Sequence, residues 1–562
     1  MRRDGRARGF SGLPINPGLL SWLRVPAPAR RLAPVLALLL LTACGTHGMQ
    51  DGTTGELFAR GIEQITDLYI EPIPSQKLVL VGAKNLAKLD SRLGVTIGGD
   101  VRDRDQVSLT YDGMPVANYQ VPADIDGNAG AEIISRLIAV AKKASSRVAA
   151  LPEDTIDKAV FDGMTGALDR FSRYASPDEA RDQRAARDGF GGIGVTLETA
   201  NSDFSVTAVS EQSPAEHAGI RVGDKIVAID GTPVAGRQAS DIIHQLRGPI
   251  GTIVGLTIER PGVAGTRDFK IERALVVVPT VTASHDGNIA IFHVASFNQS
   301  TTQRVTEGLI EAQRQANGHL GGIVLDLRGD PGGLLDQAVS LSDLFIAKGP
   351  IIATTGRHPA SHQYFAATGH SLAPSTPLVV LINGGSASAS EIVAAALQDV
   401  GRAVVIGSSS YGKGTVQTVM RLPNDGELTL TWARLVTPSG YFLQQHGVVP
   451  TLCTSGLSDT DGSLDTVLRR PVDAGDADAS HPRASLDEAA WSTLRQSCPA
   501  QPGAPALDIK VAERVLSDPA RYAAALGAIH PAGVSALPPP APPADAALTA
   551  GGSGLSSTPR TP

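Results

Sequence analysis

The stretch LVVLINGGSASASEI, at residues 378–392, decides the fold prediction. Its first five residues are all apolar, which is typical of a strand that is buried on both faces of a sheet. Two glycines end this strand, and the pattern then predicts a helix over 387–397. A strand that leads directly into a helix places a hydroxyl at the helix N-terminus, where backbone amides and the helix dipole stabilise developing negative charge.

Serine is also a favoured N-cap residue, so a simple helix cap is an alternative for this stretch. One cap needs one serine, whereas three alternate here, at Ser386, Ser388 and Ser390. The two serines beyond the one that a cap needs favour a catalytic hydroxyl in this stretch.

The regions on either side predict several domains. Apolar runs at 323–327 and 403–406 indicate further buried strands, and these alternate with helices as in an α/β layer. The predicted fold is therefore a multidomain combination of α+β and α/β parts. Its segments are a lipoprotein-type signal peptide (1–43), a mostly helical N-terminal region (56–188), a β-rich domain (189–275), an α/β core of mixed sheet and helices (276–455), a C-terminal extension with helices at 486–496 and 508–517 (456–530), and a disordered tail (531–562).

A lysine with glycine on both sides follows the next predicted strand, in YGKGTVQ at 411–417. Because Lys413 lies between two apolar β-segments, we expect its side chain to be partly buried. Burial disfavours an ammonium ion and lowers its pKa, which leaves a neutral amine able to take a proton from a serine. The alternative is a turn lysine that reaches solvent, but such a lysine would not need the flanking glycines.

Three other patterns invite a ligand-binding interpretation. Residues 407–413 fit G-x-x-x-x-G-K, yet a glycine follows where a phosphate loop needs Ser or Thr, and the next residues alternate as in a strand. Residues 189–194 match G-x-G-x-x-G, but a charged stretch precedes them and a strand follows. His358 and His362 flank Pro359, which argues against a helix that presents both to one metal. All three are weak candidates.

In combination, the serine and lysine motifs resemble those of the C-terminal processing peptidases, also called tail-specific proteases, a family of Ser-Lys serine proteases with a PDZ domain. The resemblance extends over about residues 155–450. Each motif alone is unspecific, but together they are highly specific. They are GALDRFSRY (166–174), LDLRGDPGGLL (325–335), SASASE (386–391), YGKGTVQ (411–417) and TPSG (437–440).

The resemblance implies roles for the matching residues. The family nucleophile falls on Ser388 and the general base on Lys413. Gln417 matches a residue that helps to orient the lysine, and the backbone amides of Gly332 and Ala389 match the oxyanion site. No metal and no cofactor are implied.

Two positions qualify the match. Asp399 lies where some members carry a functional acid, and an acid on a helix surface is an equally good interpretation. Residues 329–333 read GDPGG where the family usually has Asn-Asn-Pro-Gly-Gly. This departure keeps the glycine pair and changes only the side chains next to it.

The β-rich segment 189–275 resembles a PDZ domain. The resemblance implies that a glycine-rich loop offers its amides to a peptide C-terminal carboxylate, and that the adjoining strand pairs with the peptide by β-augmentation. Ile193 and the helix at 239–246 would frame an apolar pocket. A domain kept only for packing is the alternative. The predicted peptide-binding residues are Gly191, Gly192, Ile193 and Gly194.

The N-terminus has the features of an export signal. Arg30 and Arg31 precede an apolar run at 32–41, which is too short to span a membrane but has the order of a secretory signal. LTACG at 41–45 resembles the bacterial lipobox, in which the cysteine, here Cys44, is acylated. We therefore expect a periplasmic protein anchored to the membrane by an N-terminal lipid, with an ordinary cleaved signal as the alternative.

Export changes the interpretation of the other two cysteines. If Cys44 carries the lipid, Cys453 and Cys498 remain as an even pair in an oxidising compartment. A disulfide that ties the C-terminal segment to the core is then expected, with two buried thiols as the alternative. Three cysteines also exclude a metal site of four thiolates.

Composition and motifs together lead to a functional prediction. With 49 Lys and Arg against 56 Asp and Glu, the net charge is −7, which argues against a nucleic-acid binder. We predict a serine endopeptidase that cleaves exported or periplasmic proteins near their C-termini. Its partners would be peptide tails and, through the lipid, a membrane. A catalytically silent, membrane-tethered PDZ scaffold is the alternative.

Overall fold

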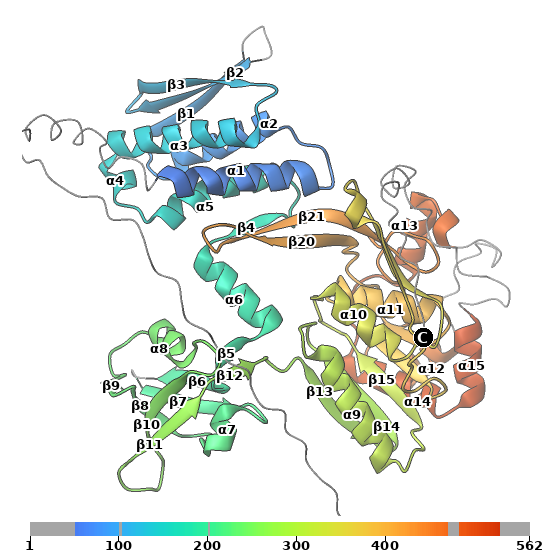
Figure 1. Ribbon diagram of the computed structural model, residues 1–562. Helices are drawn as coiled ribbons and strands as arrows, with labels where there is room; N and C mark the ends of the chain where they lie inside the picture. The colour runs from blue at the N-terminus through green and yellow to red at the C-terminus, as the bar shows by residue number, and fades with distance from the viewer. Residues whose placement is uncertain (1–50, 100–103, 201–202, 470–482, 529–562) are drawn as a thin grey trace, which may run out of the picture. The chain divides into compact units, whose positions relative to one another are not determined.

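The computed structural model describes residues 51–99, 104–200, 203–469 and 483–528 (Figure 1). The predicted signal segment, Cys44 and the predicted tail at 531–562 lie outside these residues. Among the helices that are described, none combines the length and apolar character that a membrane span requires.

The N-terminal region is mostly helical, as predicted, and contains one small sheet. Phe58, Ile62 and Ile65, which the sequence spaces along one helix face, are fully buried. Phe58 packs on Phe161 with ring centroids 5.4 Å apart. The elements are α1 (Asp51–Leu68), α2 (Ser75–Asn85), η1 (Leu86–Lys88), antiparallel β1 (Leu93–Gly99), β2 (Arg104–Tyr111) and β3 (Met114–Pro122), α3 (Gly127–Ala144), α4 (Ser146–Ala149) and α5 (Glu153–Thr165).

Two features of this region differ from the sequence prediction. Apolar residues at helical spacing over 155–171 predict one helix, but α5 ends at Thr165. It ends there because the Asp169 carboxylate accepts from the amides of Phe171 and Ser172 and closes a turn. Helix α6 (Pro177–Asp188) is not predicted, since its sequence is polar almost throughout. A capping box at Ser176 starts it.

The PDZ region is built around one main sheet. Its strands pair in the order β11-β10-β8-β7-β6, so β6 is an edge strand. Ile242 and Leu246 of α8 (Ala239–Leu246), a helix with the predicted bounds, are buried in the domain core. A separate pair joins β5 (Phe190–Gly192) to β12 (Ala274–Val276). The other elements are β6 (Val195–Ala200), β7 (Asp203–Val209), α7 (Pro214–Ala218), β8 (Lys225–Ile229), β9 (Thr232–Pro233), β10 (Ile253–Glu259) and β11 (Thr266–Glu272).

The α/β core contains a six-stranded sheet in the order β13-β14-β15-β18-β19-β22. Within this sheet, β14, β15, β18, β19 and β22 run parallel to one another, and β13 is an antiparallel edge strand. Leu325 packs in the apolar cluster that includes α11, whereas Val324 packs in the cluster that includes α14 (Pro505–Leu516), so both faces are covered. The other elements are β13 (Val281–Asp286), β14 (Ile289–Val294), α9 (Thr301–Gln315), β15 (Gly322–Asp326), α10 (Leu335–Asp343), β18 (Leu378–Ile382), α11 (Ala389–Asp399), β19 (Val404–Gly407) and β22 (Leu452–Cys453).

The core has a second sheet, and two of its strands, β20 and β21, follow the predicted catalytic lysine. Its strands pair in the order β17-β16-β21-β20, and β4 (Arg173–Ala175), which belongs to the N-terminal region, joins it by pairing with β21. The segment 166–174 is therefore attached to the core. The other bounds are β16 (Pro350–Thr355), η2 (Pro359–Ser361), β17 (Gln363–Ala366), β20 (Thr415–Arg421) and β21 (Glu427–Val436).

The C-terminal extension is helical over the residues described. Helices α13 (Glu488–Ser497) and α14 correspond to the two predicted helices, whereas α12 (Asp461–Arg469), η3 (Arg483–Ser485) and α15 (Pro519–Gly527) are not predicted. A disulfide joins Cys453, at the end of β22, to Cys498, directly after α13. The extension is therefore covalently attached to the core sheet.

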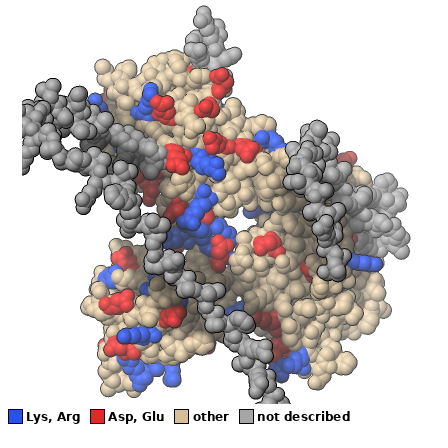
Figure 2. All heavy atoms as spheres, viewed as in Figure 1, with Lys and Arg blue, Asp and Glu red and all other residues tan. Residues whose placement is uncertain are grey.

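The surface carries both signs of charge. On the described part of the face in Figure 2, acidic and basic side chains are interspersed, apart from a group of basic side chains near the middle of the view. The described part of this face therefore has no continuous basic surface of the kind that nucleic-acid binding uses.

Candidate active site

Ser388 lies at the sharp turn between β18 and α11, where it is the N-cap of the helix. Its φ of 57° and ψ of −111° fall outside the regions that residues with a side chain prefer. A residue strained in this way persists only where its surroundings fix it, and such residues cluster at functional sites. The turn is therefore a suitable position for the predicted nucleophile.

The three serines of this turn differ in what their hydroxyls do. Ser386 Oγ donates to the carbonyl of Leu327 at 2.7 Å, and Ser390 Oγ donates to the carbonyl of Asp330 at 2.9 Å. Both serines are fully buried, whereas Ser388 is half-buried. Ser386 and Ser390 thus hold the turn in place, and Ser388 is the one of the three that substrate can reach.

Gly332 lies directly against this turn. Its φ is 96°, and a Cβ there would come within 2.8 Å of the Ala389 nitrogen and 2.9 Å of Ser388 Cβ. Only glycine fits this close approach. The two residues predicted for the oxyanion site, Gly332 and Ala389, therefore adjoin the predicted nucleophile, and their role stays a prediction.

The amide of Gly332 already has a partner in this structure, since it donates to Asp330 Oδ1 at 2.7 Å. Asp330 is fully buried, and burial raises the pKa of its carboxyl to about 7. Its other oxygen, Oδ2, is buried without a hydrogen-bond partner among the described residues. The departure from the family pattern thus places a poorly solvated carboxyl next to the predicted oxyanion site.

Glu391, which the sequence analysis does not single out, connects the predicted nucleophile and base. Its Oε2 accepts from the amides of Ser388 at 2.8 Å and Lys413 at 2.9 Å. Its Oε1 accepts from the amide of Gly412 at 2.6 Å and the hydroxyl of Ser410 at 2.5 Å. Burial raises the pKa of this carboxyl, and the four hydrogen bonds lower it. A sequence signal did exist, because Ser-x-x-Glu is the pattern of a capping box.

Lys413 is partly buried, as predicted. Burial lowers its pKa, the positive charge of Arg173 lowers it further, and the charge of Glu391 acts in the opposite direction. Its Nζ lies 5.1 Å from the ring centroid of Phe171, in the segment before β4. In the part of the chain that the structure describes, no hydrogen bond joins the Ser388 hydroxyl to this Nζ, so the Ser-Lys dyad stays a prediction.

Two other candidates have partners outside the predicted dyad. Gln417 Nε2 donates to the hydroxyls of Thr415 and Thr431 at 3.0 and 3.2 Å. Its role in orienting the lysine stays a prediction. Asp399 is 7% exposed, and its Oδ2 accepts from the amide and hydroxyl of Ser439. The interpretation of Asp399 as a surface acid is therefore wrong, because this carboxylate is buried and holds the TPSG turn.

The predicted peptide-binding residues of the PDZ domain lie around β5. Gly191 and Gly192 are part of β5, and Ile193 is 2% exposed within the domain core. Gly194 has a φ of 81° and leads into the edge strand β6. These residues therefore come directly before a strand edge that no other described strand pairs with, which is the feature that β-augmentation needs.

The structure contradicts the nucleotide-binding interpretations. Strand β20, and not a helix, follows Lys413, and residues 189–194 lie between α6 and β6 instead of between a strand and a helix. His358 caps the short turn η2, and His362 follows that turn. Within the described ranges, no group of three or more His, Cys, Asp or Glu side chains is arranged to hold a metal ion.

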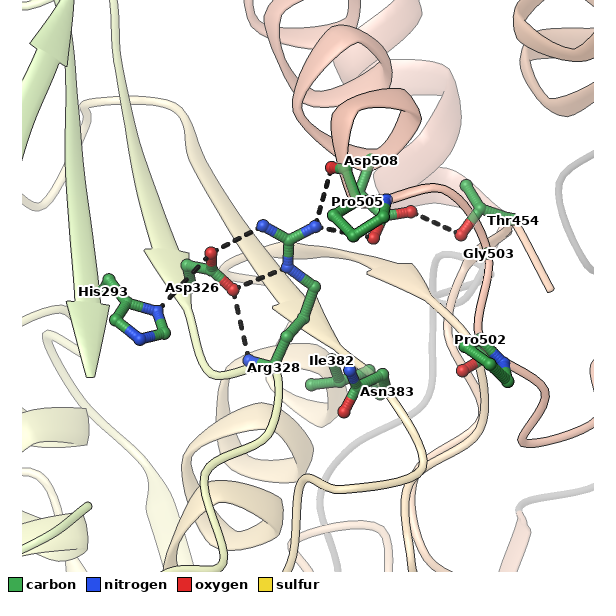
Figure 3. Close-up of a pocket in the computed structure, with 11 residues that line it drawn as sticks. His293, Asp326, Arg328, Ile382, Asn383, Thr454, Pro502, Gly503, Pro505 and Asp508 are labelled. Atoms are coloured by element: carbon green, nitrogen blue, oxygen red, sulfur yellow. Dashed lines mark hydrogen bonds and ion pairs between the residues drawn. The ribbon is translucent and has the colours of Figure 1, made fainter. Parts of the chain in front are cut away.

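A pocket lies at the carboxyl ends of β14, β15, β18 and β19 (Figure 3). The Arg328 guanidinium donates to both oxygens of Asp326, at 2.8 and 2.7 Å, and to Asp508 Oδ2 at 2.9 Å. Thr454 Oγ1 donates to the other oxygen of Asp508 at 2.6 Å. The predicted catalytic residues do not line this pocket. Because Asp508 belongs to α14, the pocket marks the place where the extension docks on the core.

Known proteins share both the core and the PDZ domain. The profile of Peptidase family S41 matches residues 288–453, and that of the PDZ domain matches residues 205–260. The carboxy-terminal-processing protease of Bartonella bacilliformis is 39% identical over 323 residues, 57% of this chain and 74% of that protein. The carboxy-terminal processing protease CtpA of Bacillus subtilis is 33% identical over 301 residues, 53% of this chain and 64% of that protein. The solved photosystem II D1 C-terminal processing protease is 29% identical, with a TM-score of 0.32, over 54% of this chain and 84% of that one.

A peptidase core of this family with a PDZ domain defines a serine peptidase that binds peptide or protein substrates. Within that class, the chain belongs to the family of C-terminal processing peptidases. The family predicted from the motifs is confirmed, and so is the multidomain fold of helices and mixed sheets.

Proposed function

We propose that this chain is a serine endopeptidase that uses Ser388 as nucleophile and Lys413 as general base. The observation that carries the proposal is the shared oxygen of Glu391, because amides of both residues donate to it and the two backbones therefore lie close together. The accessible position of Ser388 and the lowered pKa of Lys413 support the same assignment.

The reaction begins when Ser388 Oγ attacks the carbonyl carbon of the scissile peptide and its proton passes to neutral Lys413 Nζ. The amide of Ala389, the dipole of α11 and the amide of Gly332 then stabilise the oxyanion. For this, the Gly332 amide must exchange Asp330 for the oxyanion as its partner.

The tetrahedral intermediate collapses when the C–N bond breaks. Lys413 returns its proton to the leaving amine, and an acyl-enzyme ester remains on Ser388. A water molecule that gives a proton to Lys413 attacks this ester. As the ester C–O bond breaks, Lys413 returns this proton to the Ser388 oxygen. The products are the free serine and a new peptide carboxyl group, which ionises in water.

The PDZ domain would select C-terminal tails. Strand β6 offers an open edge to an extended peptide, and α8 lies in the same domain with Ile243 40% exposed. An apolar tail could pair with the strand and contact this isoleucine. Capture of the tail would bring the adjacent chain to the peptidase site.

The site of action that we propose is the periplasm, with Cys44 acylated and its lipid in a membrane. The charge-then-apolar order of the N-terminal sequence supports this location. The Cys453–Cys498 disulfide supports it independently, because such bonds persist in oxidising compartments. The substrates would then be exported proteins, cleaved near their C-termini.

The test uses the purified chain, a peptide with an apolar C-terminal tail and a fluorophosphonate serine probe. We expect wild type to cleave the peptide and react with the probe. Ser388→Ala should do neither and still bind the peptide, while Lys413→Ala should lose both activities near neutral pH. Persistent cleavage by pure Ser388→Ala refutes the assignment. Peptide binding by a wild-type protein that neither cleaves nor reacts would instead identify a silent PDZ scaffold.

A further inference from the structure

The C-terminal extension reaches the loop that carries Lys413. The contacts come from α13 and the cysteine that follows it, a segment that we name the C-terminal clamp (Glu488–Cys498). The clamp lies beyond residue 453, where the match to the S41 profile ends. Its function is therefore not given by the family match.

Arg495 of the clamp binds two backbone carbonyls of the core. Its Nη2 donates to the carbonyl of Ser410 at 3.1 Å, and its Nη1 donates to the carbonyl of His446. Ser410 is also the residue whose hydroxyl donates to Glu391. One arginine of the extension thus fixes the backbone that carries a hydrogen-bond donor to Glu391.

Arg495 also brings positive charge to the buried Glu391. Both charged groups lie next to Gly447. A Cβ added to this glycine would lie 2.8 Å from Arg495 Nη1 and 3.1 Å from Glu391 Oε1, so the guanidinium and the carboxylate are close to each other. Burial lowers the pKa of Arg495, and the charge of Glu391 opposes this effect. A buried carboxylate needs hydrogen bonds and a nearby cation to stay ionised.

Other contacts hold the clamp against this loop and against other parts of the core. Ser409 Oγ donates to the carbonyl of Cys498 at 2.5 Å, and the disulfide joins Cys498 to Cys453. Trp491 stacks on His446 with ring centroids 4.5 Å apart. The clamp is therefore fixed covalently at its end and by an aromatic contact within its helix.

We propose that the C-terminal clamp positions the peptidase site, with Arg495 as the positioning residue and the Cys453–Cys498 disulfide as the anchor. The inference rests on the proposed Ser-Lys chemistry. Arg495 acts through Ser410 and Glu391, whose carboxylate holds the amides of the nucleophile and the base. Loosening the clamp should therefore slow catalysis and leave tail binding at the PDZ domain unchanged.

The first test replaces the arginine. In Arg495→Gln we expect kcat to fall about 100-fold with little change in KM, since misplacing catalytic groups by about 1 Å has an effect of this order. Labelling of Ser388 by the fluorophosphonate should slow by a similar factor. Arg495→Lys keeps the charge and should recover part of the loss. Arg514→Gln, which changes an exposed arginine of α14, is the matched control and should keep the wild-type kcat.

The second test removes the anchor. Dithiothreitol reduces the disulfide to two thiols and is itself oxidised to its cyclic disulfide. We expect this treatment to slow wild type to the rate of a Cys453→Ser/Cys498→Ser variant and to leave that variant unchanged. Thermal unfolding and binding of the tail peptide, measured for every variant, separate a positioning effect from loss of fold. If Arg495→Gln does not fold, the change in kcat when the folded wild type is reduced tests the proposal instead.

The outcomes are distinct. A wild-type kcat in both Arg495→Gln and the double cysteine variant would overturn the clamp, and so would a change confined to KM. A wild type that neither reacts with the probe nor cleaves the peptide would refute the proposed peptidase function and the clamp together.

Discussion

The amides of Ser388 and Lys413 donate to the same oxygen, Oε2 of Glu391, at 2.8 and 2.9 Å. The serine is the N-cap of α11, whereas the lysine precedes β20, with β19 between them in the chain. One buried carboxylate therefore fixes two backbones that belong to different elements. Substitutions of the carboxylate, of the charges around the lysine and of residues in the neighbouring glycine loop can therefore test this arrangement.

Replacing Glu391 by Gln should weaken both the fold and the activity. The side chain keeps its shape, but one acceptor oxygen becomes an NH₂ group that faces two donors. Each buried donor left unpaired costs about 1–3 kcal/mol. We expect a lower free energy of unfolding in urea and a lower kcat. Glu56→Gln, at an exposed position of α1, is the control, and equal stability of the two variants would contradict the prediction.

Cleavage should increase with pH, because only the neutral amine of Lys413 can accept the serine proton. Burial lowers this pKa from its usual 10.5, so the midpoint of the ascending limb of kcat/KM should lie below that value. In Arg173→Gln, a positive charge that lowers the pKa is lost, and the limb should move to higher pH. The pH dependence of kcat/KM measures both effects.

Other charges that act on the lysine are Arg170, which also lowers its pKa, and Glu391 and Asp169, which raise it. All three remain in Arg173→Gln, so the comparison isolates one charge. Arg181→Gln, at an exposed arginine of α6, should leave the limb in place. Identical pH profiles for wild type and Arg173→Gln would show that this charge does not act on the base.

Asp330 should make the native state less stable as pH rises. Its pKa is about 7 in the folded chain and 3.8 as the ordinary value, so the unfolded chain releases the proton first. The contribution of Asp330 to the free energy of unfolding therefore falls as pH rises from 3.8 to about 7, by roughly 4 kcal/mol at most. Above that range this contribution is constant. Asp330→Asn cannot titrate and can still accept from the Gly332 amide.

Urea unfolding of wild type and Asp330→Asn between pH 4 and 8 tests this dependence. The variant should gain stability relative to wild type as pH rises towards 7 and hold that gain above it. Asp157, whose pKa burial also raises to about 7, is present in both proteins and cancels. Parallel curves would mean that Asp330 does not carry the effect.

Replacing Gly332 by Ala should abolish most activity. The added methyl would lie 2.6 Å from the Ala387 carbonyl oxygen and 2.8 Å from the Ala389 nitrogen, so the loop must move away from the oxyanion site. Loss of one oxyanion donor typically lowers kcat by about 100- to 1,000-fold. Gly329→Ala is the matched control, because its φ of 74° imposes similar backbone strain with nothing within 4 Å of the new Cβ. A normal kcat in Gly332→Ala would contradict the assignment.

Local patterns were sufficient to predict the strand–turn–helix that holds Ser388. The five apolar residues of β18 are all buried, and α8 has the predicted bounds, because burial pattern and element type follow directly from side-chain periodicity. The partial burial of Lys413 followed from its position between apolar segments.

Contacts between distant segments were not predictable in this way. Glu391 meets Ser410 and Gly412 only after α11 and the loop behind β19 have packed together, and nothing in the sequence near Glu391 encodes that meeting. The unpaired oxygen of Asp330 likewise depends on the closed packing around it. Helix α6 escaped prediction since its polar sequence has no apolar stripe to detect.

If the clamp positions the peptidase site as proposed, the bond between Cys453 and Cys498 makes the rate of catalysis depend on the redox state of the surrounding compartment. Cytosolic thiols keep such cysteines reduced, so a freshly synthesised copy would hold α13 by non-covalent contacts only. In that reduced state the protein would cleave slowly while it is still in the cytosol with other newly synthesised chains. Secretion would then complete its maturation by oxidation, without removal of any inhibitory segment.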